Sequence, residues 1–257
     1  MKLIKQSKLL TFQVILSLII LNTQISFAQD KKINLKSWEG SYAGLGYSDS
    51  KLVDDHIEVR TSDGTANGYT GHISSEKKTP SIFIGYNWVD EKKHLSGLEF
   101  SIEKRNFFKS DFQYLNGVVE TTFPTTLKSE GYGYSLKGRI GEIINDQTLI
   151  YVTGGIAIVP IERKFCATSC NTGSQIDTYK RNERGLILGL GLEHKLQGDI
   201  SLKFDYEHRE YETPDFVPVN AWQNLKEIHD TSENSFKVSL VKSFWLFSKK
   251  IIIFLSL

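Results

Sequence analysis

Residues 185–211 read GLILGLGLEHKLQGDISLKFDYEHREY, and this stretch decides the fold. In its first half a leucine recurs at every second position from Leu186 to Leu192. In its second half apolar side chains alternate with polar ones from Ile200 to Tyr206. Strict alternation in two adjacent runs, joined by a short polar link, predicts a β-hairpin with one apolar and one polar face. Such a hairpin fits a water-soluble barrel or a transmembrane barrel, because only the direction of the apolar face differs.

The same alternation occurs in eight separate runs along the chain, which we predict to be strands. Short turns and long polar segments connect these runs alternately. An even number of strands, with long loops at one end and short turns at the other, is typical of barrels in the outer membrane. The sequence therefore predicts an all-β fold, an eight-stranded antiparallel up-and-down transmembrane β-barrel. The predicted strands are 38–47, 80–88, 95–105, 130–141, 148–159, 185–194, 200–211 and 234–244, and the predicted long loops are 48–79, 106–129, 160–184 and 212–233.

The N-terminal segment differs from the strands in composition. Three lysines precede a mostly apolar run at 9–20, and Ser26 and Ala28 are small residues at the positions that a signal peptidase reads. We expect residues 1–28 to be a cleaved signal peptide and the protein to be exported. The alternative is an uncleaved membrane anchor, which the short run and its polar Gln13 disfavour.

The bulk composition limits the classes of function. The chain has 257 residues, 24% of them charged, and a formal net charge of +1, which suits one domain of medium size. A near-neutral charge gives no reason to expect a nucleic-acid partner.

The polar face of the predicted strands carries five acidic and six basic side chains. The interior of an eight-stranded barrel is just wide enough for side chains to fill it. Charges placed there must pair, because an unpaired buried charge costs several kcal/mol. We therefore predict a salt-bridged plug, with a narrow ion path as the alternative. The residues of this predicted lumen network are Glu99, Glu103, Arg105, Lys137, Arg139, Glu193, Lys203, Asp205, Glu207, Arg209 and Lys237.

Several short motifs resemble those of a known family. Residues 38–44, WEGSYAG, look like the W-x-G-x-Y-x-G opening of small Gram-negative porin-family proteins of the opacity type. Residues 85–88, GYNW, resemble the second strand of that family, 135–141, SLKGRIG, the fourth, and 189–193, GLGLE, the last long hairpin. The motifs keep their order and spacing through 38–244. The resemblance implies a barrel surrounded by outer-membrane lipid, and a role in adhesion, ligand binding or envelope maintenance.

The C-terminus departs from that family. Its members end in an aromatic residue that the outer-membrane insertion machinery reads, and Phe244 occupies that position here. The resemblance thus implies a barrel domain over 29–244 with Phe244 as the insertion signal. The remaining residues, 245–257, form an apolar extension, which fits either a peptide lying in the membrane interface or the product of a lost stop.

Two cysteines occur close together in the third predicted loop. In an exported chain, Cys166 and Cys170 predict a disulfide that clamps this loop, provided that their Cα atoms come within about 7 Å. A free pair or a metal-bound pair is the alternative, but no histidine neighbours them in the sequence.

The histidines give no indication of chemistry. His56, His72 and His229 fall in predicted outer loops, where we expect them to be solvated; the alternative is that they contact haem or a metal. We therefore predict no metal site and no cofactor. In the seventh strand, His208 is an odd number of residues from both Ser201 and Glu207 and so points to the opposite face. We therefore predict no catalytic residue.

The function expected from the sequence is structural or interaction-based, through outer loops that meet an extracellular ligand or a host surface. Three alternatives are left open. They are a narrow porin-type channel, an outer-membrane lipid-modifying hydrolase, and a soluble periplasmic ligand binder of lipocalin type with its apolar face inside.

Overall fold

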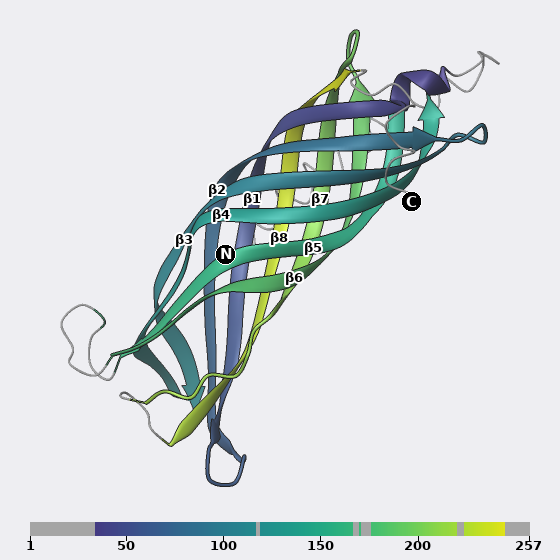
Figure 1. The fold of residues 1–257 in the computed structure, drawn as a ribbon. Helices are drawn as coiled ribbons and strands as arrows, with labels where there is room; N and C mark the ends of the chain where they lie inside the picture. The colour runs from purple at the N-terminus through teal and green to yellow at the C-terminus, as the bar shows by residue number, and fades with distance from the viewer. Residues whose placement is uncertain (1–33, 117–118, 167–169, 171–175, 220–223, 245–257) are drawn as a thin grey trace, which may run out of the picture. The chain divides into compact units, whose positions relative to one another are not determined.

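A computed structural model describes residues 34–244, apart from 117–118, 167–169, 171–175 and 220–223 (Figure 1). The predicted signal peptide and the C-terminal extension lie outside these residues. The described chain forms one short helix and eight strands. They are η1 (Leu35–Trp38), β1 (Gly40–Arg60), β2 (Ala66–Val89), β3 (His94–Asn116), β4 (Val119–Asn145), β5 (Thr148–Cys166), β6 (Ile176–Lys195), β7 (Ile200–Glu212) and β8 (Leu225–Phe244).

Each strand pairs in antiparallel fashion with its neighbour in sequence, and β1 also pairs with β8, so the sheet is a closed barrel. The seam between the first and last strands runs without a register shift from Ser41 opposite Phe244 to Arg60 opposite Leu225. The predicted fold class is confirmed. Within the described residues, no helix has both the length and the apolar character needed to cross a membrane.

Apolar side chains face outward in a continuous band around the barrel. Leu188, for example, is 69% exposed and Val152 62% exposed, whereas the charged Lys203 of the opposite face is 1% exposed. A lipocalin-type barrel would have the reverse arrangement, so that alternative is wrong. Above the band the outward positions become polar, as at Asp49 and Lys78. We take the apolar band as the membrane-spanning part of the barrel.

The strands extend well beyond this band, which corrects the predicted loops. The segment 48–79 is strand except for the turn at 61–65, the described parts of 106–129 and 160–184 are almost entirely strand, and 225–233 of the fourth predicted loop is strand. Both faces of the strands mix polar and apolar residues there, so the contrast between faces that reveals a strand is weaker. We call these parts the strand extensions. They comprise 48–60, 66–79, 106–116, 119–129, 160–166, 176–184 and 225–233.

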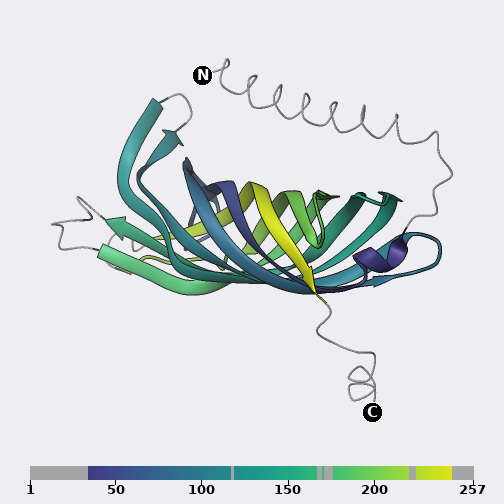
Figure 2. The same ribbon diagram turned by 90° about the horizontal axis from the view of Figure 1, so that it is seen from above.

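One pair of extensions bends outward. Figure 2 shows the outer end of the β3–β4 hairpin, in teal, curving away from the barrel axis. Pairing between β2 and β3 is interrupted between His72 and Ser81 and resumes at the outer end, where 69–72 pair with 113–116.

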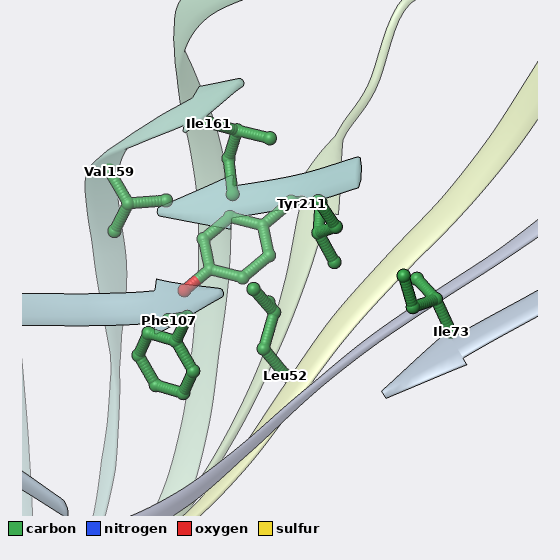
Figure 3. Packing of buried hydrophobic residues seen from close by; sticks show 7 residues of the cluster. Leu52, Ile73, Phe107, Val159, Ile161 and Tyr211 are labelled. Atoms are coloured by element: carbon green, nitrogen blue, oxygen red, sulfur yellow. The ribbon is translucent and has the colours of Figure 1, made fainter. Parts of the chain in front are cut away.

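An apolar cluster fills the interior where the strand extensions begin (Figure 3). On β1 it precedes the charged Asp54, on β5 it precedes Arg163, and on β7 it follows Arg209. This apolar layer therefore separates an inner group of interior charges from an outer group. Its residues are Leu52, Ile73, Phe107, Leu127, Val159, Ile161 and Tyr211.

Candidate functional site: the charged interior of the barrel

All eleven residues of the predicted lumen network lie buried inside the barrel. Strand alternation places them there, because each occupies the inward phase of its strand. They form three levels along the barrel, which we describe from the end that carries the short turns.

Arg139 is the centre of the first level. Its Nη1 lies 3.0 Å from Oε2 of Glu193, and its Nη2 donates to Oδ1 of Asn87 at 2.8 Å. The guanidinium is 4.4 Å from the ring centroid of Tyr42 and 5.2 Å from that of Tyr151. Arg139 is thus held by charge, hydrogen bonds and two aromatic rings.

The second level connects two carboxylates through lysines. Lys137 Nζ lies 2.9 Å from Glu99 and 2.6 Å from Glu207. Lys203 also pairs with Glu99 and lies 3.7 Å from Asp205, while Lys237 lies 3.3 Å from Glu207. Each of these charges has an opposite charge within reach, as burial requires.

The third level lies directly below the apolar layer. Arg209 donates to both oxygens of Glu103, at 2.7 and 3.0 Å. Arg105 lies 2.5 Å from Glu103 and 2.8 Å from Glu233, which also accepts a hydrogen bond from Tyr211. Glu233 is not among the eleven predicted residues. With it, the lumen network has six acids and six bases and is balanced in charge.

An outer group of charges lies above the apolar layer, inside the strand extensions. Arg163 is fully buried, with Nε 2.8 Å from Asp54 and Nη1 2.5 Å from Glu183. Asp54 in turn accepts from Thr231 at 3.0 Å and lies 3.1 Å from Nδ1 of His229. Side chains from β5 and β8 thus contact Asp54 on β1.

Two histidines and two glutamates lie next to this group on the seam between β1 and β8. The register places His56 opposite His229 and Glu58 opposite Glu227. The expectation that His56 and His229 are solvated loop residues is wrong, since they are only 3% and 7% exposed. His72, by contrast, is exposed and contacts Asp55.

The two buried histidines differ in charge, although both lie outside the membrane-spanning band. Burial lowers the pKa of His56 to about 3, so this ring is neutral. Burial also acts to lower the pKa of His229, but the Asp54 carboxylate outweighs it and raises the pKa to about 9. Near neutral pH the seam therefore holds one neutral imidazole, that of His56, and one positively charged imidazole, that of His229.

The cysteines lie at the outer end of the β5 extension. Cys166 and Cys170 form a disulfide with a Cα–Cα distance of 5.3 Å. The neighbouring Phe165 is buried and stacks on Phe216, with ring centroids 5.0 Å apart. Because the Phe165 ring also lies 5.8 Å from His229, the disulfide follows a strand end that packs against the outer charged group.

The residues weighed as a catalytic set do not converge. Ser201 faces inward and donates to Glu193, whereas His208 contacts Asn234 on the outer face. Phe244 is the last residue of β8 and lies opposite Ser41 on β1. These positions agree with the strand phases read from the sequence.

The outer group was missed because its strands were ended too early. A signal was present: Asp54, His56 and Glu58 recur at period two, and so do Glu227 and His229, in phase with the interior positions of β8. Extending the polar face of each strand past the apolar band would have found them.

Comparison with known proteins agrees with this architecture. Residues 15–244 match the family model of the outer membrane protein β-barrel domain. A 31 kDa outer-membrane immunogenic protein of Brucella melitensis is 25% identical over 199 residues, which cover 72% of this chain and 75% of that protein.

Two solved structures align over most of the chain. Ail of Yersinia pestis aligns over 80% of this chain and 99% of its own, with 15% identity and a TM-score of 0.45. Neisserial surface protein A aligns over 80% of this chain and 97% of its own, with 10% identity and a TM-score of 0.41.

Proposed function

The chain belongs to the outer membrane protein β-barrel domain family, and from this premise we propose that it is a non-catalytic surface protein with a closed lumen. Its barrel anchors it in the outer membrane, and its strand extensions meet a ligand or a host surface outside the cell. The observation that supports a closed lumen is the charge-balanced lumen network, which extends from the level of Arg139 to the level of Glu233.

The network opposes conduction for a physical reason. Twelve charged side chains from five strands fill the interior, and an eight-stranded barrel is only wide enough to hold side chains. An ion that passed through would have to displace pairs such as Arg105–Glu233, and separating such a buried pair costs several kcal/mol. The channel alternative thus requires a path that these side chains occupy.

The strand extensions supply the contact surface. On β1, His56 lies nine residues past Tyr47, the last outward apolar residue of the band. At roughly 3.3 Å per residue this is about 30 Å along the strand. Most outward side chains on the extensions, such as Asp55 and Glu76, are exposed and polar, and exposed apolar residues such as Ile57 lie among them. A mostly polar surface of this length suits recognition of a partner more than lipid contact.

Conductance in planar bilayers tests the closed lumen. We expect the folded wild-type protein to give no ion-conducting steps, whereas a variant with Arg105→Ala and Glu233→Ala, which removes a buried pair, should conduct. The matched control, Lys128→Ala with Glu130→Ala, removes an exposed pair and should stay silent. Regular steps from the wild type would establish the channel alternative instead.

Epitope insertion tests the display of the strand extensions. A peptide tag inserted in the turn at 61–65 should bind antibody on intact cells. The same tag in the turn at 90–93, at the opposite end of the barrel, should bind only after the outer membrane is permeabilised. Labelling of the 90–93 tag alone on intact cells would reverse the proposed orientation.

Phe244 is proposed as the residue that the insertion machinery recognises, since it ends the last strand. Phe244→Ala should lower the yield of inserted barrel. Phe236→Ala, in the middle of the same strand, should give a yield much closer to that of the wild type. Equal yields from both variants would remove this role.

A further inference from the structure

Four side chains on the seam above the apolar layer have the composition of a metal site. We propose that His56, Glu58, Glu227 and His229 bind a divalent transition metal of the zinc class, which ties β1 to β8 outside the membrane. Ligand atoms of His56, Glu58 and Glu227 all lie within 4.8 Å of one another. Nε2 of His229 lies 3.3 Å from Oε2 of Glu227, so the second imidazole borders this three-residue group.

The donor set selects the class of metal. Two imidazoles and two carboxylates favour zinc and its neighbours over magnesium or calcium, which prefer oxygen ligands alone. In a tetrahedral zinc site with bonds of about 2.1 Å, neighbouring donor atoms are roughly 3.4 Å apart. Nε2 of His229 and Oε2 of Glu227 are 3.3 Å apart, which is close to this spacing. The ligand atoms of His56, Glu58 and Glu227, now within 4.8 Å of one another, would move closer together around the ion.

His229 is oriented as a ligating histidine would be. Its Nδ1 lies 3.1 Å from Asp54, which leaves Nε2 facing Glu227. Ligating histidines usually have their second ring nitrogen held by a carboxylate in this way, which fixes the ring and raises its basicity. Asp54 is itself held by Arg163 and Thr231. The supporting shell of a metal site is therefore already formed.

The strand register makes a cation favourable at this position. Glu58 and Glu227 lie directly opposite each other, and they are only 1% and 2% exposed. Like charges on directly opposed residues destabilise a sheet, and burial strengthens their repulsion. A divalent ion bound between the two carboxylates would attract both of them and so offset their repulsion.

The surroundings leave room for the site and cover it. Gly71 lies opposite His56 on β2, and a Cβ there would be 2.1 Å from Cε1 of the His56 ring. On the outer side, the Phe165 ring lies 5.8 Å from His229, and the backbone of Phe216 pairs with that of Glu227. A shell of this kind restricts water and strengthens metal–ligand bonds.

Zinc titration of the tag-free folded protein tests the proposal. We expect one equivalent of Zn²⁺ to bind per chain, with micromolar or tighter affinity, and Co²⁺ in its place to give the intense visible absorption of a tetrahedral site. Glu227→Gln and His56→Asn should each weaken binding by at least about tenfold. His72→Asn, which changes an exposed histidine away from the seam, should bind as the wild type does.

A gel shift on boiling shows whether each variant has folded. The proposal is overturned if the folded wild type binds no Zn²⁺ at 100-fold excess over the protein, or if the folded Glu227→Gln and His56→Asn variants bind as tightly as the wild type. Should a variant not fold, the wild-type Co²⁺ spectrum decides. An octahedral spectrum without nitrogen ligands would also overturn it.

Discussion

Gly191 lies against the ring of Tyr151, and a Cβ built on it would be 2.2 Å from Cζ of that ring. Gly191→Ala should therefore displace Tyr151 and break its hydrogen bond to Asp205. We expect a loss of roughly 1–3 kcal/mol, the usual cost of overpacking a close-packed interior. Urea unfolding of the barrel in lipid vesicles measures it.

Gly154 is the matched control for this substitution. It also lies in a barrel strand, but the nearest atom to its Cβ would be 3.8 Å away. Gly154→Ala should leave stability unchanged or raise it slightly, because alanine restricts the unfolded chain more than glycine does. Equal losses at both positions would show that the contact with Tyr151 is not the cause.

Arg105 connects Glu103 and Glu233 at the top of the lumen network. Arg105→Met would leave two buried carboxylates with less compensation, and we expect a loss of roughly 3–5 kcal/mol. Adding Glu233→Gln removes one of these charges and should recover part of the loss. The same unfolding measurement compares the two variants. A double variant no more stable than the single one would contradict the pairing.

The interior charges of the membrane-spanning band could be read from the sequence. There each charged residue, such as Lys203 or Asp205, alternates with an apolar neighbour, and the contrast in polarity reveals the strand phase. Around Asp54 and His56 the outward positions mix apolar with polar side chains, so the contrast that marks the strand phase is weaker. Which of the interior charges pair, as Arg105 does with Glu233, depends on barrel geometry and could not be read in advance.

At the level of elements, the strand extensions show the same limit. Residues 48–60 form regular strand although their outer face is largely polar, because hydrogen bonds to both β2 and β8 hold them in register. Tertiary pairing, rather than local preference, decides their conformation. The number and order of the strands could be predicted from the sequence, whereas their length outside the membrane could not.

The disulfide acts on the end of one hairpin. Replacing Cys166 and Cys170 with serine should destabilise the protein by only about 2 kcal/mol, since the closed loop is short and its loss of entropy small. We expect the barrel to fold and shift on boiling as before, while protease cuts the β5–β6 connection faster. Unchanged cleavage with and without the disulfide would contradict a clamping role.

For the whole molecule, closure of the barrel predicts heat-modifiability. The unboiled protein should migrate differently from the boiled one on SDS gels, because a closed sheet without free edges resists detergent. Outer and inner membranes separated from expressing cells should contain the shifting form in the outer fraction. A soluble periplasmic form without a shift would contradict the orientation of the apolar band.

The pairing of β1 with β8 also determines how the molecule must assemble. Arg105 meets Glu233 across 128 residues of sequence, and Asp54 meets His229 across 175. Bringing such distant residues together costs conformational entropy and is therefore slow. The favourable contacts form only when the strands at both ends of the chain are in place. A partly made barrel thus exposes unmatched charges and two open edges. We expect the pairing of β8 to be the step that completes folding. A chain lacking β8 should therefore be degraded rather than retained as a smaller barrel.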